Sequence, residues 1–384
     1  MDILTIEQYG EAERAGAERS CNRIIQCCAP TLFLHYAYPT TVASMTGLRR
    51  YVDVMHEGRV AATFRDYLEG ITEHEFELLY RVTRAVAELA EARYGRRLVA
   101  TASLLRALHL VRQIRFLHPE PNVTIFEIGH GSGFVGALLI AAGYGYASTD
   151  ITEGFYVYQN HLMNALAPGR VIELATDPRP LSDLAGLEPG TALHVPWWKF
   201  MVAAPEGPFT CEVVTCNHAL AEMHVNALSY SLAFARRMLA PRDGAFVFEG
   251  WGATEFCPIW AVAKRFADLD YVIAHNNMPV SVFVPANTAN AMGALRLPLP
   301  WRKDVVRHAN AYPQQAFIET FHPPIYITDN NPLSALITAG REAIKPRYNK
   351  TLGDVEAMWR QVLGRDDLAS DDERFLHVVG SGPI

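Results

Sequence analysis

The chain contains 384 residues, of which 50% are hydrophobic and 20% are charged, and its formal net charge is −7. These proportions are typical of a globular protein with a sizeable core, and the 34 basic residues form no stripe, so neither nucleic acid nor an anionic membrane is expected as a partner. Six cysteines make no disulfide framework, the apolar run at 134–147 is too short to cross a bilayer, and the charged first residues are unlike a signal peptide, so a cytoplasmic location is expected.

The region 1–118 is predicted to be mostly helical. Thr72 and Glu75 have the spacing of a capping box, and apolar residues recur at helical spacing after them and again near 104–111. Apolar stripes of this kind need a surface to cover them. The region is therefore expected to be a helical layer that packs on the core or forms the interface of a homodimer.

The segment 124–133 predicts a strand that ends in a glycine-rich turn. The run 124–128 reads as a buried strand, and Gly129, Gly131 and Gly133 follow it at every second position. Glycine allows a sharp backbone turn and lets a ligand approach with no Cβ in the way. The helix predicted at 134–142 offers unpaired N–H groups at its start. This turn is therefore predicted to bind a cofactor.

Two cofactor classes fit this turn. The dinucleotide fingerprint G-x-G-x-x-G ends at Gly136, while the pattern E-x-G-x-G-x-G of S-adenosylmethionine methyltransferases begins at Glu127. In both classes a carboxylate at the end of the next strand, here Asp150, accepts hydrogen bonds from a ribose diol. The carboxylate of Glu127 would repel a pyrophosphate but attract the cationic methionine end of S-adenosylmethionine. The sequence thus favours the methyl donor over a nicotinamide or flavin nucleotide.

The fold predicted from the remaining pattern is an α/β, Rossmann-like sheet. The last two strands are separated by only five residues, 275–279, which permits antiparallel pairing alone. Five parallel strands closed by an antiparallel pair give the seven-stranded sheet of a class I methyltransferase, whereas dinucleotide-binding folds usually continue parallel. Besides 124–128 and 146–149, strands are expected at 192–195 (with 170–174 as a rival for the same place), 212–216, 245–248, 271–274 and 280–284.

Three regions are expected along the chain. The N-terminal helical region, 1–118, precedes an S-adenosylmethionine-binding core, 119–288. The C-terminal region, 289–384, is rich in proline and has one clear helical pattern, 352–363. It is expected to be an extension that packs on the core.

Short motifs within the core resemble the sugar O-methyltransferase family of class I S-adenosylmethionine-dependent enzymes. The first is Asp150-Ile151-Thr152-Glu153, followed by Gln159 and Leu162, and the second is the stretch 217–223 after the fourth strand. The chain departs from the family at Thr152, where the family has proline. The resemblance implies methyl transfer from S-adenosylmethionine to a hydroxyl of a sugar or glycosylated metabolite.

The candidate donor-binding residues surround the glycine turn. Ile151, beside the ribose acid, is expected to lie against the adenine, and Trp197 to cover its other face or simply to pack as a core aromatic. His130 is expected to present only its backbone. The complete candidate set is Glu127, Gly129, His130, Gly131, Gly133, Asp150, Ile151, Trp197 and Asn217.

The candidate general base follows the fourth strand. His218 and Glu222 are four residues apart, which places them on one face of the helix expected to begin there, so that Glu222 would support His218. The spacing of these two residues and His224 matches no known ligand set, so a divalent metal is possible in principle but not favoured. Second-rank acceptor contacts are His275, Asn276, Glu249 and Trp251.

The expected activity is therefore S-adenosylmethionine-dependent methylation of a small polar molecule, with an O-methyltransferase favoured. Three alternatives stay open. One is an N- or C-methyltransferase that works by proximity without a base, and another is an NAD(P)-dependent oxidoreductase. The third is a non-enzymatic partner protein with the same fold.

Overall fold

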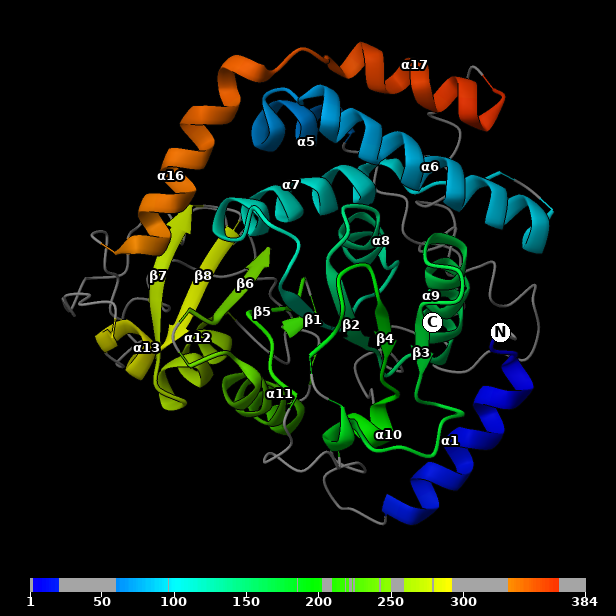
Figure 1. Cartoon of the computed structure of the whole chain (residues 1–384), viewed down its shortest axis with the longest axis vertical. Helices are drawn as coiled ribbons and strands as arrows, with labels where there is room; N and C mark the ends of the chain where they lie inside the picture. Colours follow the sequence, from blue (N-terminus) through cyan, green and yellow to red (C-terminus); the bar gives the residue numbers. More distant parts are fainter. Residues whose placement is uncertain are drawn as a thin grey trace.

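The centre of the molecule is an eight-stranded mixed sheet with the order β3-β4-β2-β1-β5-β6-β8-β7 (Figure 1). The computed structural model describes residues 3–20, 60–95, 97–184, 186–201, 209–217, 219–220, 223, 225–241, 243–249, 259–277, 280–291 and 331–365. The strands are β1 (Thr124–Ile128), β2 (Gly145–Thr149), β3 (Val171–Glu173), β4 (Ala192–His194), β5 (Val213–Thr215), β6 (Ala245–Glu249), β7 (Tyr271–Asn277) and β8 (Val280–Pro285).

The strand directions agree with the prediction, but the strand count does not. All neighbouring strands from β3 to β6 pair in parallel, while β8 is antiparallel to both β6 and β7. The predicted seven strands are eight, because 171–173 and 192–194 both form strands and lie side by side instead of competing for one place.

Successive residues of the central strands point to opposite faces of the sheet and supply two hydrophobic clusters. On β1, Ile125 belongs to one cluster and Phe126 to the other, and both side chains are fully buried. Every residue of β1 is buried, as it must be when helices cover both faces of a parallel sheet. The apolar sequence that predicted these strands is explained by this double coverage.

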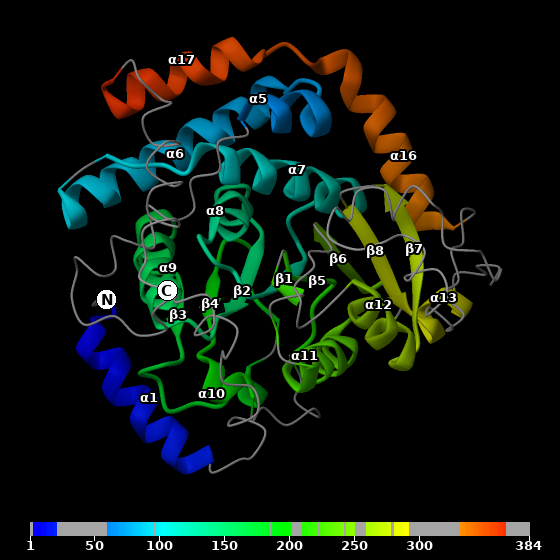
Figure 2. The same cartoon turned by 180° about the vertical axis from the view of Figure 1, so that it is seen from behind.

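Helices cover both faces of the sheet (Figures 1 and 2). The cluster that holds Ile125 also contains side chains of α6, α7, α8 and α9, whereas the cluster that holds Phe126 contains side chains of α11 and α12. No helix in the described ranges is long and apolar enough to span a bilayer. The longer helices are α1 (Ile6–Ser20), α6 (Glu73–Tyr94), α7 (Thr101–Leu117), α8 (Phe134–Ala141), α9 (Glu153–Leu166), α11 (Val225–Met238), α12 (Ile259–Asp268), α16 (Pro332–Ile344) and α17 (Leu352–Leu363).

Helices from the two ends of the chain share one layer above α8 (Figure 1). The predicted capping box of Thr72 and Glu75 begins α6. Helix α17, which the sequence predicted, packs on α6, and the Trp359 indole donates to Thr83 Oγ1 at 3.3 Å. Helix α16, which it did not predict, packs on α7. The apolar stripes of α6 and α7 are thus covered within the chain, while the homodimer and the domain boundaries stay predictions.

Candidate active site

The glycines after β1 adopt the left-handed conformation that a sharp turn requires. The φ angles of Gly129, Gly131 and Gly133 are 71°, 50° and 73°. At Gly133 the backbone conformation disfavours any other residue, and an added Cβ would also lie 2.9 Å from the amide nitrogen of Gln159, so the Gln159 side chain would have to shift. The predicted glycine turn is therefore present at the carboxyl end of β1, where parallel sheets bind their ligands.

Gly136 has a different role from the glycines of the turn. It lies inside α8, and an added Cβ would come within 2.3 Å of the Tyr146 ring on β2. This glycine lets the helix pack closely on the strand. Its role here is packing, so Gly136 does not by itself identify the cofactor.

Glu127 lies beneath the turn as a buried acid, with 2% of its surface exposed. The Tyr146 hydroxyl donates to its Oε2 at 2.5 Å, and the Asn217 amide donates to its Oε1 at 3.1 Å. Burial raises the pKa of Glu127 to about 8, and the two hydrogen bonds only partly offset this effect. Within the described ranges this carboxyl forms no salt bridge. The site thus has a buried acid that a cationic ligand would stabilise in its charged form.

Tyr146 connects Glu127 to the helix behind it. The amide of Gln159, on α9, donates to the Tyr146 hydroxyl at 3.1 Å. Tyr146 was not among the predicted site residues, and Gln159 entered only through the family resemblance. The alternation of β2 carried the signal for Tyr146, because Ser148 lies two residues after it on the same face of the strand and Asp150, directly after the strand, continues the same alternation.

Asp150 follows β2 and is 6% exposed. Its Oδ2 accepts a hydrogen bond from the Gly131 N–H at 3.1 Å, and its Oδ1 accepts one from the Thr152 N–H at 2.7 Å. Burial raises the pKa of Asp150 to about 6 against the lowering effect of these bonds. A carboxylate accepts about four hydrogen bonds, so each oxygen retains capacity for a ribose hydroxyl. The geometry is compatible with the predicted role.

The neighbouring strands also end in polar side chains that sequence reasoning missed. Glu173 ends β3 and His194 ends β4, and His194 Nδ1 lies 2.9 Å from Glu173 Oε2. His194 Nε2 lies 3.4 Å from His130 Nε2. The side chain of His130, predicted to present only its backbone, therefore takes part in a buried polar chain. A polar residue at the end of each apolar run was the signal available in the sequence.

On the other side of β1, polar contacts continue toward β6. Asn217 follows β5, and its Oδ1 accepts a hydrogen bond from the backbone N–H of Glu249 at 3.0 Å. The Glu249 side chain is buried and its Oε2 lies 3.3 Å from His109 Nδ1 on α7. Asn217 thus connects the Glu127 carboxyl, which is predicted to bind the methyl donor, to the backbone of Glu249, a second-rank candidate.

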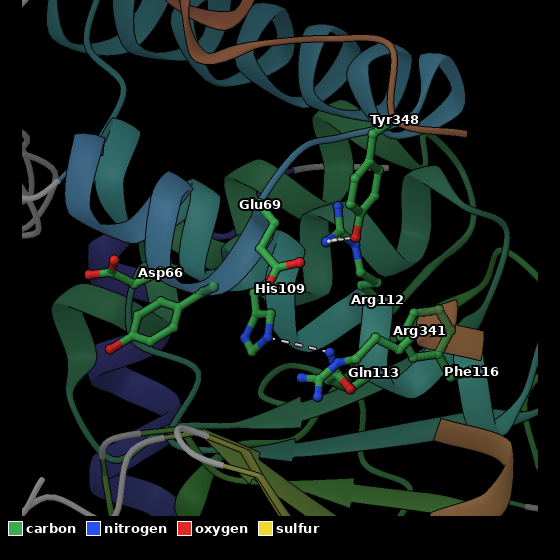
Figure 3. A pocket seen from close by; sticks show the side chains of 9 residues that line it. Asp66, Glu69, His109, Arg112, Gln113, Phe116, Arg341 and Tyr348 are labelled. Carbon is green, nitrogen blue, oxygen red and sulfur yellow. Dashed lines mark hydrogen bonds between the residues drawn. The ribbon is translucent and has the colours of Figure 1, made fainter. Parts of the chain in front are cut away.

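A polar cleft opens beside His109 (Figure 3). His109 and Gln113 project toward it from α7, and their side-chain nitrogens are 3.3 Å apart. Its lining is mainly polar and also includes Tyr67, Glu69, Arg341 and Tyr348. Such a lining suits a hydroxylated or charged molecule better than an apolar one. Sequence reasoning did not identify this cleft, because its lining comes from three separate parts of the chain.

The two predicted adenine contacts differ in their surroundings. Ile151 is half-buried directly after Asp150, as expected. Trp197 is also half-buried, but its indole N–H donates to Glu13 of α1 at 2.7 Å and its ring packs edge-on against Trp198. These contacts support the packing alternative for Trp197, whose contact with adenine stays a prediction.

The predicted general base lies outside the described residues. This holds for both His218 and Glu222, as it does for His224 and Trp251. The described residues between β5 and α11 (217, 219, 220 and 223) are not α-helical, so the prediction that a continuous helix opens directly after β5 is wrong, while the roles of His218 and Glu222 stay predictions. Asn217 and Ala219, on either side of residue 218, do lie near the turn: an added Cβ on Gly129 would come within 2.8 Å of Ala219.

The second-rank residues His275 and Asn276 are not in a loop. Both belong to β7, which is longer than predicted, and they pair with Val282 and Ser281 of β8. The Asn276 side chain accepts a hydrogen bond from the Ser281 hydroxyl at 3.0 Å. Among the residues that the structure describes, no group of histidine, cysteine and acidic side chains has the arrangement of a metal site.

Comparison with known proteins gives matches among solved structures only. No family model and no curated protein matches the chain. One matching structure is magnesium protoporphyrin IX methyltransferase from Synechocystis PCC 6803 with bound SAM, with TM-score 0.31, 13% identity, and coverage of 47% of this chain and 83% of that one. The CurJ carbon methyltransferase (TM-score 0.31, 14% identity, 48% and 54%) and the pyocyanin biosynthetic protein PhzM (0.31, 14%, 47% and 56%) also match. Similarity this low carries no argument, so the inferences below rest on the geometry.

Proposed function

We propose that the chain is an S-adenosylmethionine-dependent methyltransferase that acts on a small polar acceptor, by preference a hydroxyl of a sugar or glycosylated natural product. The observation that carries this proposal is the buried Glu127 carboxyl beside the glycine turn, with its pKa raised to about 8. Such a group gains most from a ligand that brings a positive charge. S-adenosylmethionine carries two, the α-ammonium and the sulfonium.

A second carboxyl suits the ribose diol of the proposed cofactor. Asp150 ends the strand beside β1 and accepts hydrogen bonds from two backbone N–H groups. Asp150 would serve the ribose of either cofactor class, whereas a pyrophosphate at this turn would meet the carboxyl group of Glu127. A ligand with a cationic end and a ribose diol uses both groups favourably.

The cleft in Figure 3 supports a polar acceptor. Hydrogen bonds connect it to the proposed donor site through Glu249 and Asn217. Its polar lining suits a hydroxyl group of the kind that the family resemblance implies, and the cleft has room for only part of such a molecule. That the methyl group is transferred to a hydroxyl oxygen, and not to a nitrogen or carbon atom, is part of the proposal.

Calorimetric titration with S-adenosylhomocysteine and with NADH tests the cofactor. S-adenosylhomocysteine is the product of methyl transfer and retains the α-ammonium and the ribose. We expect saturable binding of S-adenosylhomocysteine and none of NADH at pH 8, where half of Glu127 is ionised before the ligand arrives. Saturable binding of NADH alone would replace this proposal with the oxidoreductase, and binding of neither would favour the non-enzymatic partner protein.

His218 is retained as the proposed general base because it follows Asn217 directly in the sequence. If a hydroxyl must be deprotonated, His218→Ala should lower kcat by about 100-fold or more. The assay measures S-adenosylhomocysteine formation over a panel of sugars and glycosides. His74→Ala, at an exposed position on α6, is the matched control. Unchanged turnover in His218→Ala would favour the N- or C-methyltransferase, which works by proximity.

A further inference from the structure

Two neutral side chains hold the Glu127 carboxyl from opposite sides of its strand. The Tyr146 hydroxyl lies 2.5 Å from Oε2, and the Asn217 amide nitrogen lies 3.1 Å from Oε1. Tyr146 belongs to β2 and Asn217 follows β5, and these are the two strands that pair with β1. The two contacts together therefore fix the rotation of the carboxyl group.

A backbone group settles the orientation of the Asn217 amide. The N–H of Glu249, which can only donate, lies 3.0 Å from the atom assigned as Oδ1, so the other atom, Nδ2, is the one that faces Glu127. The direction of that hydrogen bond is fixed, because an amide nitrogen can only donate. The Thr215 hydroxyl lies 3.3 Å from Oδ1 and 3.1 Å from Nδ2. Contacts within the protein thus occupy all four hydrogen-bonding positions of the Asn217 amide.

The Tyr146 hydroxyl is fixed in place by packing and by a hydrogen bond. Tyr146 is fully buried, its ring fills the space that a Cβ on Gly136 would need, and the Gln159 amide donates to its hydroxyl at 3.1 Å. When Glu127 is ionised its carboxylate can only accept, so the hydroxyl proton of Tyr146 points toward it. Each carboxylate oxygen then accepts one hydrogen bond from the protein and keeps one acceptor position for a ligand.

We propose that Asn217 and Tyr146 are positioning residues for the methyl donor, which hold the Glu127 carboxylate so that its two remaining acceptor positions receive the cationic methionine end. This inference rests on the proposed function of the glycine turn. Asn217 was expected to bind the donor, and here it acts through Glu127, because its own amide is occupied within the protein. Its contact with the Glu249 N–H also ties the carboxyl to β6.

Both contacts favour the charged form of Glu127. Burial raises the pKa of Glu127 to about 8, while the hydrogen bonds from Tyr146 and Asn217 lower it. The titratable groups that act on Glu127 are Tyr146 of β2 and Asp150 at the end of that strand, and the Asp150 charge raises the pKa. Loss of either hydrogen bond should therefore raise the pKa of Glu127 further. A side chain with a purely structural role would have no such effect.

The first test is the affinity for S-adenosylhomocysteine from pH 6 to 9, measured by calorimetric titration. In the unsubstituted protein the affinity should rise up to about pH 8 as Glu127 ionises. Tyr146→Phe and Asn217→Ala should each move this rise to higher pH by about one unit and weaken binding at pH 8 by about tenfold. Tyr144→Phe is the matched control, because Tyr144 is a buried tyrosine directly before β2 whose hydroxyl donates to His118 O instead.

The same two substitutions in a Glu127→Gln background test whether their effect passes through the carboxylate. Glutamine at this position cannot ionise, so adding Tyr146→Phe or Asn217→Ala should shift no pH profile and should cost less affinity than it does beside the carboxylate. An equal loss of affinity in both backgrounds would mean contact with the ligand or packing alone, and would overturn the proposal. Single variants that match the unsubstituted protein at every pH would also overturn it.

The second test is the NMR spectrum of the unsubstituted protein without ligand, which does not depend on how the variants fold. The side-chain N–H signals of Asn217 should shift with a midpoint near pH 8, because one of these protons bonds to the Glu127 carboxyl. Signals that stay constant between pH 6 and 9 would contradict the proposal. Absence of S-adenosylhomocysteine binding at every pH would remove the proposed function, yet these signals would still decide whether Asn217 holds the carboxyl.

Discussion

Glu127→Gln is expected to weaken S-adenosylhomocysteine binding by about 10- to 100-fold at pH 8, the range for loss of a hydrogen bond to a charged group. The glutamine keeps the size of the side chain, and its single oxygen can still accept a hydrogen bond from one of the two donors, Tyr146 or Asn217. It lacks the negative charge that a cationic methionine end requires. The measurement is a calorimetric titration of both proteins.

The same substitution should stabilise the protein. Glu127 has a pKa of about 8 in the folded chain, against about 4.3 for an unperturbed glutamate, so between these values the folded state binds a proton that the unfolded state has released. Stability is therefore lost as the pH rises through this window. Glu127→Gln cannot ionise and does not share this loss. Its melting temperature should exceed that of the unsubstituted protein at pH 8, and the difference should close toward pH 4.

Ligand binding should release a proton from Glu127 at pH 7. A cation beside the carboxyl lowers its pKa, so the affinity rises with pH up to about 8. Calorimetry in buffers with different ionisation enthalpies measures this release, which should be absent in Glu127→Gln. Glu212→Gln is the control, since Glu212 accepts a hydrogen bond from the Thr124 N–H at the opposite end of β1. Equal affinity for the ligand in Glu127→Gln and the unsubstituted protein would contradict the donor role.

The part of the site that the sequence predicted is the part encoded by local patterns. The strand β1, its glycine turn and the helix α8 are continuous in the chain, and positive φ at Gly129 and Gly133 is a local property of the backbone. Glu127 and Asp150 were placed by their positions at the ends of two adjacent strands. Local sequence patterns were therefore enough to identify the residues predicted to bind the methyl donor.

The part that the sequence did not predict depends on register between distant strands. Glu173 meets His194 because β3 and β4 pair in register, and His194 reaches the turn because β4 pairs with Ser148 of β2. Strand β3 has only three residues, too few to show a period. The start of the helix expected directly after Asn217 was misplaced. The sequence pattern indicated the helix that is α11 (Val225–Met238), but not the residue at which it begins.

The sequence predicted a helical layer, but it did not predict which helices form that layer. Helix α16 joins it from the far end of the chain, with Asn331 as its N-cap and Pro332 at its first position. Those two residues were a usable start signal. Its contact with α7 could not be predicted, because Gly340 packs directly on Phe116 and no local pattern shows which distant helix a glycine will meet.

Arg112→Met is expected to destabilise this layer by about 3–5 kcal/mol, the cost of leaving a buried charge without its partner. Arg112 is 4% exposed, and all five of its N–H groups donate: two to Glu75 and the others to Leu68 O, Gly70 O and the Tyr348 hydroxyl. Although Arg112 lines the cleft in Figure 3, its donors are therefore already used within the protein.

The buried charge of Glu75 explains why the loss of Arg112 should lower the free energy of unfolding so strongly. Burial alone would raise the pKa of Glu75, but the Arg112 charge and the hydrogen bonds from Arg112 and Thr72 outweigh burial and hold it below its ordinary value. Without Arg112 the buried carboxylate has lost its cation. Glu75→Gln removes that charge, so the double variant should be more stable than Arg112→Met alone.

Urea unfolding of the two single variants and the double variant measures this coupling. Arg84→Met is the matched control, since Arg84 pairs with Glu88 on the exposed face of α6 and its loss should leave the unfolding free energy nearly unchanged. An effect of Arg112→Met as small as that of Arg84→Met would contradict the assignment. Because Glu75 also caps α6 and Tyr348 lies between α16 and α17, this one arginine joins segments from both ends of the chain into the layer that carries the cleft.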